Sequence, residues 1–327
     1  MLRRWFLCGA VIAGSGLVGT PMTLAQDGSD YPSRVVTIVV PFPAGGSTDT
    51  IGRFLAQDLT KSLGQQFIVD NKPGANGNIG TAGVARAGAD GYTLLISGVG
   101  SNAINYTLYP KLGFDPKDLA HITLLITGPN VLVANPDFEA KTFKEFVELA
   151  KAKPNEFNYA SSGVGSSGHL AMEMLKQQAG IELTHVPYKG GAPAMTDVIG
   201  GQVPVMFINQ DVALPQIAAG KLRVLAVASP ERNPAYPDTP TIAESGFPDF
   251  SAVSWFGLSA PAGTPKPIID KLRAEAVTAL TNPEFKRRME ENGFVVVGST
   301  PDEFTAFVAA ETGKWGNVIT KGGIKAE

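Results

Sequence analysis

The residues best suited to binding chemistry form a short glycine loop near the start of the chain. Residues 41–49 read Pro-Phe-Pro-Ala-Gly-Gly-Ser-Thr-Asp, and they stand between an apolar run, 35–40, and an amphipathic stretch, 48–63. This order predicts a strand, a glycine turn and a helix N-terminus. The first turn of a helix leaves backbone N–H groups unpaired at the positive end of its dipole, and glycine lets a ligand approach them. We therefore expect a small anion to bind at residues 41–49.

A second loop of the same kind follows about 120 residues later. The run 157–160 leads into Ser-Ser-Gly-Val-Gly-Ser-Ser-Gly-His at residues 161–169, and a helical stretch continues from there to residue 178. The hydroxyl and backbone groups of this loop suit the same anion chemistry. Two such loops predict a ligand with two ends, or a ligand held between two lobes.

The N-terminus is predicted to be a signal peptide, residues 1–25. Arg3 and Arg4 precede the apolar residues 5–18, and the small-residue exit 23–25 follows. A membrane-spanning helix is the rival interpretation, but glycines interrupt an apolar run that is shorter than the roughly 20 residues a span needs. We expect the mature chain to begin near Gln26 and to reach the periplasm by the Sec or the twin-arginine route. Cys8 is the only cysteine, so the mature chain has no disulfide and no thiolate site.

Composition limits the class of partner. The formal net charge is −3, and removal of the two arginines in residues 1–25 makes it −5, which argues against nucleic acid as a partner. About 300 remaining residues, with 44% hydrophobic and 17% charged residues in the whole chain, predict an ordinary globular protein of two lobes. No coiled-coil or interface pattern in the sequence contradicts a monomer.

Strand-like and helix-like stretches alternate along the chain. Strands are predicted at residues 35–40, 66–70, 92–97, 121–126, 131–134, 158–161, 183–187, 203–207, 223–228, 255–260 and 295–297. The clearest helices are predicted at residues 48–63, 142–152, 167–178, 266–281, 283–292 and 301–318, with Thr264 as the N-cap of the fourth and Pro265 in its first turn. This order predicts an α/β fold of mostly parallel sheets with helices on both faces, and ligands bind at the carboxyl ends of such strands.

The first lobe is predicted to consist of two separate segments of the chain, and the second lobe of one. Lobe 1 would comprise residues 26–122 plus 252–327, and lobe 2 would comprise residues 123–251. The proline-rich residues 230–250 are predicted to run over the surface as a connector. Two crossing strands would then form a hinge about which the lobes close on a ligand.

Several motifs together resemble one family. They are residues 41–49, the Asn-Lys-Pro-Gly-Ala-Asn-Gly-Asn-Ile-Gly loop at 71–80, Asp-Gly-Tyr-Thr-Leu at 90–94, the loop 162–166 with His-Leu at 169–170, Val-Pro-Tyr-Lys-Gly-Gly at 186–191 and Ala-Gly-Lys-Leu-Arg at 219–223. Over essentially the whole mature chain they look like the extracytoplasmic solute receptors of tripartite tricarboxylate transporters, the Bug family. The resemblance implies a two-lobed type II periplasmic binding protein fold with a two-strand hinge, a small mono- or dicarboxylate ligand and delivery to integral membrane transporter subunits.

The resemblance also implies a set of ligand-binding residues. Carried over by motif, they are Phe42, Ala44, Gly45, Gly46, Ser47, Thr48 and Asp49 on lobe 1, and Ser162, Gly163, Ser166, Ser167 and Tyr188 on lobe 2. Ordered waters bridge part of the ligand in that family. One departure stands out: after Met206 and Phe207 the family often has Asp-Asn, and this chain has Ile208-Asn209.

Structural interpretations of the same residues remain open at this stage. Asp49 follows Gly46 by three residues and could accept first-turn N–H groups as a cap of the helix. A carboxylate close to a bound anion repels it, which favours this structural role over contact with the ligand. Ser166 and Ser167 could cap the second helix, and Tyr188 could pack between elements. For His169 we favour a structural role, since a helix N-terminus disfavours an imidazolium.

The rival functions are a ligand sensor for a membrane signalling protein and an exported enzyme acting on carboxylates. Residues 163–168 spell G-x-G-x-x-G, but no hydride-handling group accompanies this motif, and a lone copy is a weak sign of a nicotinamide cofactor. His121, His169 and His185 share no metal-ligand spacing. No nucleophile stands beside a base in the sequence. We expect a binding protein that is not an enzyme and that uses no cofactor and no metal.

Overall fold

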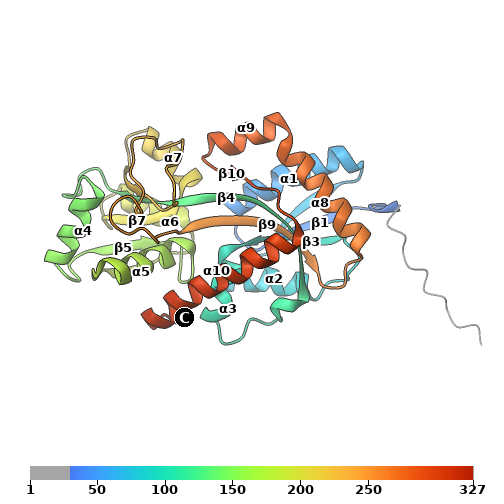
Figure 1. The fold of residues 1–327 in the computed structure, drawn as a ribbon, viewed down its shortest axis with the longest axis horizontal. Helices are drawn as coiled ribbons and strands as arrows, with labels where there is room; N and C mark the ends of the chain where they lie inside the picture. The colour runs from blue at the N-terminus through green and yellow to red at the C-terminus, as the bar shows by residue number, and fades with distance from the viewer. Residues whose placement is uncertain (1–29, 327) are drawn as a thin grey trace, which may run out of the picture.

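The computed structural model describes residues 30–326, and the predicted signal peptide lies outside this range. Strands and helices alternate along it (Figure 1). The strands are β1 (Val36–Val40), β2 (Phe67–Asn71), β3 (Thr93–Gly98), β4 (Leu119–Ala134), β5 (Asn158–Ser161), β6 (Thr184–Pro187), β7 (Val205–Asn209), β8 (Arg223–Val227), β9 (Val253–Pro261) and β10 (Val295–Val296). The α-helices are α1 (Ser47–Leu63), α2 (Asn78–Ala85), α3 (Asn105–Leu108), α4 (Phe143–Ala152), α5 (Ser167–Ala179), α6 (Gly191–Ile199), α7 (Gln210–Ala218), α8 (Lys266–Thr281), α9 (Pro283–Glu291) and α10 (Pro301–Gly322). A π-helical turn, η3 (Gly100–Ile104), precedes α3.

The strands form one hydrogen-bonded path in the order β2-β1-β3-β9-β4-β7-β5-β6, and β8 and β10 also pair with β4. β1 runs parallel to β2 and β3, and β5 runs parallel to β6 and β7. β4 and β9 are antiparallel to each other and to their other partners. The prediction of mostly parallel sheets is therefore wrong, because two parallel blocks are joined through antiparallel crossing strands.

β4 is the longest crossing element, and it changes partners midway. It pairs with β9 as far as Pro129 and with β7 from Asn130 onward. The sequence suggested two strands here, but the structure has one 16-residue strand with register shifts near His121 and Leu124. Figure 1 shows β4 and β9 running side by side between a block that contains β5, β6 and β7 and a block that contains β1 and β3. The fold is thus the predicted mixed α/β, two-lobed fold, and its exact lobe boundaries stay predictions.

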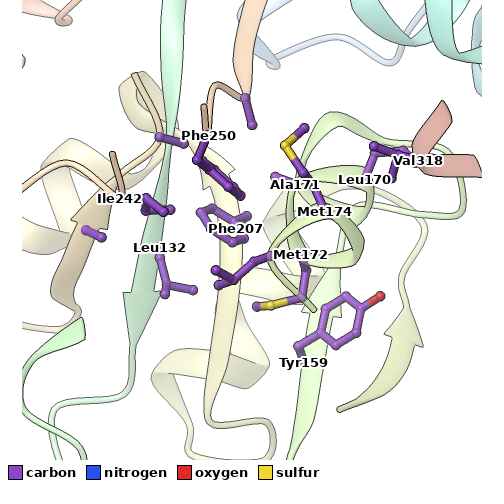
Figure 2. Close-up of a cluster of buried hydrophobic side chains, with 14 of the residues drawn as sticks. Leu132, Tyr159, Leu170, Ala171, Met172, Met174, Phe207, Ile242, Phe250 and Val318 are labelled. Carbon is purple, nitrogen blue, oxygen red and sulfur yellow. The ribbon is translucent and has the colours of Figure 1, made fainter. Parts of the chain in front are cut away.

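Each lobe has its own apolar core. In the first, side chains of β1, β3 and β9 pack against α1 and α8, and Ile38, Leu55 and Leu272 are fully buried there. In the second, Leu132 of β4 and Phe207 of β7 face Met172 of α5 (Figure 2). Buried apolar surface of this kind is the main stabilising contribution to folding.

The C-terminal helix α10 links the second core to the first lobe's elements. Val318 belongs to the same buried cluster as Leu170 of α5 (Figure 2), and the Val318 carbonyl accepts a 2.8 Å hydrogen bond from Gln177. Trp315 is fully buried, and its indole N–H donates to Glu311 at 3.0 Å. The helix continues to Gly322, past the predicted end at residue 318, because this packing extends along it.

Two local predictions are wrong. Residues 230–250 do not simply run over the surface: Tyr236, Ile242 and Phe250 are buried, and Ile242 and Phe250 point into the second core (Figure 2). Thr264 is not the N-cap of α8. The N-cap is Pro265, and the Thr264 hydroxyl instead donates to the Pro261 carbonyl at 2.8 Å.

Candidate functional site

The first glycine loop leads into a helix whose N-terminus has no side-chain cap. Gly45 has φ of +86°, a conformation that other residues adopt only with strain, and it turns the chain out of β1. Gly46 is the N-cap of α1, in extended conformation, and provides no side-chain hydrogen bond to the first turn. Ser47 and Thr48 begin the helix and are buried. The first-turn N–H groups are therefore not capped by a side chain, as an anion site requires.

Asp49 holds this loop in shape. Its Oδ2 accepts from the Gly45 N–H at 2.9 Å and from Arg53 Nε at 3.0 Å, and its Oδ1 accepts from Asn71 Nδ2 at 3.0 Å. Burial acts to raise the pKa of the Asp49 carboxyl, but the hydrogen bonds from Arg53, Gly45 and Asn71 outweigh it and lower the pKa below its ordinary value. The geometry thus gives Asp49 a positioning role within the loop.

Phe42 and Ala44 flank the turn. The Phe42 carbonyl accepts from Asn71 Nδ2 at 3.1 Å, which ties the loop to the end of β2. Its ring lies close to Gly77 and Gly100, where an added Cβ would stand 3.2 Å and 3.5 Å from the ring edge. Ala44 is exposed. Phe42 therefore packs against two glycines that have no side chain to displace it.

Several N–H groups of the second glycine loop have acceptors within the loop. Ser166 is the N-cap of α5, and its hydroxyl accepts from the His169 N–H at 3.3 Å. The Gly165 N–H donates to His169 Nδ1 at 3.1 Å, and the Gly163 N–H donates to the buried Ser161 hydroxyl at 3.1 Å. The Ser162 carbonyl accepts from the Gly190 N–H at 3.2 Å. The capping role that the sequence left open for Ser166 is confirmed.

Two stacked histidines, His169 and His185, contact the residues of this loop. The rings of His169 and His185 are parallel, with centroids 4.0 Å apart, and His185 Nε2 lies 2.7 Å from the Ser161 hydroxyl. Burial lowers the pKa of His169 to about 3, assisted by the neighbouring His185 and Lys176, and burial lowers that of His185 to about 4. His169 is therefore neutral at ordinary pH, with Nδ1 free to accept the Gly165 N–H.

Polar side chains from both lobes meet at the crossing strands. We define the inter-lobe polar cluster as Ser47 of α1, Asn130 of β4, Ser167 of α5, Asn209 of β7, Asp211 of α7 and Ser254 of β9. Ser47 Oγ donates to Asp211 Oδ1 at 2.9 Å and accepts from Asn209 Nδ2 at 3.1 Å. Ser254 Oγ donates to Asn209 Oδ1 at 2.7 Å. One hydroxyl at the start of α1 thus connects the first lobe to two residues of the second.

Ser167 completes the cluster. Its hydroxyl lies 3.2 Å from Asn130 Oδ1, 3.3 Å from Asn209 Oδ1 and 3.2 Å from Ser254 Oγ. The structure therefore brings together the predicted residues Ser47 and Ser167, one from each glycine loop. Because hydrogen bonds among buried polar groups strengthen one another, the cluster is suited to fix a polar ligand.

Tyr188 lies in a different environment. Its hydroxyl donates to Asp197 of α6 at 2.6 Å, and this hydrogen bond, with burial, raises the pKa of Tyr188 to about 12. Its ring packs against the apolar cluster that includes Ala160 and Ile208. The structure thus uses the Tyr188 hydroxyl within the second lobe, and the backbone of Tyr188 lies beside Gly163.

Sequence reasoning missed several members of the cluster: Asn130, Asp211 and Ser254. Each comes from a different strand or helix, so no local motif contains them. A signal was present for Asp211, because it closely follows the carboxyl end of a predicted strand. Ile208, where the family often has Asp, is buried at 6% exposure and faces Gly191 of α6, so it adds no polar atom to the cluster.

Asp211 is the charged group of the cluster. Its side chain is half-buried, and burial raises the pKa of its carboxyl to about 6, while hydrogen bonds from Ser47 and from the Val212 N–H limit the rise. Perturbed carboxyls at a junction of two lobes are candidates for function.

A second contact joins the lobes beside the glycine loops. Asn76 Nδ2 donates to the Gly165 carbonyl at 2.8 Å and to Asn105 Oδ1 at 2.9 Å. Asn105 in turn donates to Asn78 Oδ1 at 2.8 Å. Beside the glycine loops the lobes therefore touch through the Asn76–Gly165 hydrogen bond and the inter-lobe polar cluster, in addition to the contacts that α10 and residues 292–293 make with the second lobe.

Two further features bear on the class of protein. Within residues 30–326, no cluster of three or more histidine, cysteine or acidic side chains is arranged to hold a metal. No helix in the same range is both long and apolar enough to cross a membrane.

Comparison with known proteins gives the family. The family described as "Tripartite tricarboxylate transporter family receptor" matches residues 51–324. Bordetella pertussis BugT is 36% identical over 327 residues, which cover 99% of both chains. The periplasmic binding protein BugD is 38% identical with a TM-score of 0.83, covering 91% of this chain and all of that one.

Two similar structures contain carboxylates. The Rhodopseudomonas palustris protein Rpa4515 with adipate is 36% identical with a TM-score of 0.86, covering 90% of this chain and 99% of that one. MatC from the same organism, with bound malate, is 34% identical with a TM-score of 0.82, covering 88% and 100%. These matches cover nearly all of the residues that the structure describes. The resemblance seen in the sequence is confirmed: the chain belongs to the tripartite tricarboxylate transporter receptor family, which includes the Bug proteins.

Proposed function

We propose that this chain is a periplasmic solute-binding protein that captures a small mono- or dicarboxylate between its lobes and delivers it to the membrane subunits of a tripartite tricarboxylate-type transporter. The observation that carries the proposal is the N-terminus of α1, where Gly46 leaves the first turn without a side-chain cap. The adipate and malate bound by two similar proteins support a carboxylate as the ligand. Export through a signal peptide cleaved near Gln26 belongs to the same proposal.

The ligand would lie between the two glycine loops. We place its carboxylate on the first-turn N–H groups of α1, that of Ser47 included, and on the Thr48 hydroxyl, since the Ser47 hydroxyl already donates to Asp211. The second loop would close over it. Residues 42–46 would line the first lobe's side, and Ser162, Gly163, Ser166 and Ser167 the second's. Asp49 and Tyr188 would support the site without contacting the ligand through their polar atoms, because these atoms bond to groups of their own lobe.

Closure of the lobes is the mechanism that we infer. A carboxylate on the uncapped helix would attract the second lobe through the inter-lobe polar cluster and the Asn76–Gly165 hydrogen bond. Exclusion of water strengthens each hydrogen bond to the anion. With lobe 1 formed by residues 26–122 and 252–327 and lobe 2 by residues 123–251, β4 and the chain entering β9 would act as the hinge. Family and structural neighbours are binding proteins, so we expect a monomer that releases its ligand unchanged.

The test is calorimetry on protein recovered from the periplasm of an expressing bacterium. Its intact mass reports whether residues 1–25 have been removed. We expect one or a few carboxylates to bind, while sugars and nicotinamide cofactors do not. Ser166→Asp should weaken carboxylate binding by about tenfold at an unchanged melting temperature, because aspartate also caps a helix but adds a negative charge. Binding of a sugar or cofactor without any carboxylate would contradict the proposal.

A further inference from the structure

Asp211 stands where the two lobes meet at the anion-binding helix. It lies in the first turn of α7, and its Oδ1 accepts a 2.9 Å hydrogen bond from Ser47, the first residue of α1. An anion bound to the first turn of α1 would therefore be a close neighbour of a second acidic group. Two carboxylates that share a site repel each other unless one is protonated or a cation lies between them.

Residues 30–326 provide no cation for this carboxyl. Within the part of the chain that the structure describes, none of the ion pairs involves Asp211. The groups that interact with it are the Ser47 hydroxyl, backbone N–H groups of α7 and the phenol of Tyr236, whose own pKa Asp211 helps to raise. The acid is thus half-buried among neutral groups. Since buried charges are normally paired, a positive partner from outside would fit here.

Asp211 also has acceptor capacity left. An ionised carboxylate offers about four lone-pair positions; the Ser47 hydroxyl and the backbone N–H groups of Asp211 and Val212 bond to this carboxylate, which leaves room for one further donor. Asn209 donates its amide N–H to Ser47, and its carbonyl oxygen accepts from Ser254. Of the two second-lobe side chains that bond to Ser47, Asn209 is a donor with its own oxygen already paired, and Asp211 is the acceptor. The Asp211 carboxylate suits a ligand group that donates hydrogen bonds rather than a second carboxylate.

We propose that Asp211 selects carboxylates that also carry a protonated amine, so that the ligand class is an amino carboxylate. This inference rests on the proposed function and names its ligand more closely. The ligand's carboxylate would lie on the N-terminus of α1, and its ammonium group would donate to Asp211. The ion pair forms only when the lobes close, because Asp211 and α1 belong to different lobes.

The test compares ligands that differ only in the amine. We would measure binding of aspartate against succinate, and of β-alanine against propionate, by calorimetry at pH 7.5. The wild-type protein should bind the amino member of at least one pair about tenfold or more tightly. In Asp211→Asn the amino member should lose about tenfold in affinity, and the preference should disappear. Asp270→Asn, which removes the same charge from the exposed end of α8, should keep the preference.

A pH titration of the wild-type protein provides a second measurement that needs no substitution. Lowering the pH from 7.5 to 5.5 protonates Asp211, whose pKa is about 6, so the preference for the amine should shrink several-fold. The three histidines have pKa values of about 3 to 4, and Tyr236 has a raised pKa, so none of them titrates in this window. The same titration of Asp211→Asn corrects for protonation of the ligands.

The outcomes are distinguishable. Tighter binding of succinate or propionate by the wild-type protein, with a ratio unchanged in Asp211→Asn, would overturn the role of Asp211 but leave carboxylate capture intact. Failure of every carboxylate to bind the wild-type protein would overturn the proposed function together with this inference. A preference for the amine that persists in Asp211→Asn would show that another group recognises it, and would also overturn the assignment.

Discussion

The two glycine loops look alike in sequence and differ in what they leave unpaired. Both lie between a strand and a helix. In the first, Gly46 caps α1 without a side chain, and Asp49 holds the turn through the Gly45 N–H. In the second, Ser166 caps α5, and His169 accepts the Gly165 N–H. The first loop therefore leaves the first turn of α1 without a side-chain cap, whereas the second loop pairs the N–H groups of Gly165 and His169 internally and directs a carbonyl and a hydroxyl to the opposite lobe.

This difference follows from how each loop is supported. A carboxylate that bonds backwards from the helix, as Asp49 does, fixes the turn without covering the helix end. A hydroxyl at the N-cap bonds forwards and covers it. Similar strings of glycine and serine can thus encode an uncapped helix N-terminus in one lobe and a capped one in the other.

The largest expected effect is a loss of stability that distinguishes the tightly packed second loop from the first. In Gly168→Ala, an added Cβ would stand 2.2 Å from the Phe207 carbonyl oxygen, which belongs to the backbone of β7 and cannot rotate away. We expect the free energy of unfolding to fall by about 3 kcal/mol, despite the better helix propensity of alanine. Urea denaturation measures it. Gly46→Ala is the matched control, because the nearest heavy atom to its Cβ is 3.9 Å away and φ is −91°. Equal destabilisation by both would mean that α5 does not need its close approach to β7.

The next effect tests whether the first loop is the anion site. Gly46→Asp would give α1 the side-chain cap that it lacks, so the melting temperature should rise slightly, corresponding to about 0.3 kcal/mol. The new carboxylate would also occupy the first-turn N–H groups and repel a ligand, so carboxylate affinity should fall by about 100-fold, near 2.7 kcal/mol. Calorimetry checks the affinity, and Gly46→Ala should retain it. If Gly46→Asp still binds its carboxylate normally, the ligand lies elsewhere.

A smaller effect concerns acid. The pKa of His169 is about 3 in the folded protein, below its ordinary 6.5, so the neutral ring contributes stability above pH 6.5 that is lost as the pH falls toward 3. The pKa of Asp49 is also lowered, from 3.8, so its contribution is lost only below about pH 4. Acidification to pH 5 should therefore loosen the second loop first. The protection factor of the Gly165 amide, which corrects for the slower intrinsic exchange in acid, should fall while that of Gly45 is unchanged.

His169→Asn supplies the control for this pH effect. An asparagine side-chain oxygen can accept the Gly165 N–H in place of Nδ1 but does not titrate. The variant should lose part of the acid sensitivity, and the remainder comes from His121 and His185, whose pKa values burial lowers to about 4. An unchanged pH profile in His169→Asn would indicate that the histidine stack does not control the second loop.

Much of the fold could be predicted from local patterns. Apolar runs such as residues 36–40 and turn residues such as Gly64 mark elements that the structure has within one or two residues of the predicted ends. The direction of pairing could not be predicted, because β9 pairs with β3 and β4 from more than 100 residues away and its own sequence does not record their direction. Residues 128–130, Gly-Pro-Asn, suggest a turn, but the backbone passes through them extended since it changes from one partner strand to the next.

The candidate site, like the fold, could be predicted only where local sequence determines it. Glycine and hydroxyl residues beside a strand end reveal both loops, and Ser47 and Ser167 do meet in the inter-lobe polar cluster. Asn130, Asp211 and Ser254 were missed, because only the crossing of β4 and β9 brings them to the start of α1 and α5. Nor does the sequence distinguish the capped loop from the uncapped one. That depends on whether the neighbouring acid or hydroxyl bonds backwards to the turn or forwards to the helix.

The smallest effect measures what the second loop contributes to closure. Asn76→Gly removes the amide that donates to the Gly165 carbonyl at 2.8 Å and to Asn105 Oδ1, and only the first of these hydrogen bonds joins the two lobes. Glycine tolerates the positive φ of 49° at this position. One hydrogen bond of this kind contributes about 1 kcal/mol, so carboxylate affinity should fall about fivefold through faster release. Stopped-flow dissociation checks the rate. Asn155→Gly, at φ of 59° in the loop before β5, controls for the added backbone freedom. Because the first loop would still hold the anion, binding should weaken without disappearing, and a loss as large as that of Gly46→Asp would mean that both loops contribute equally to capture.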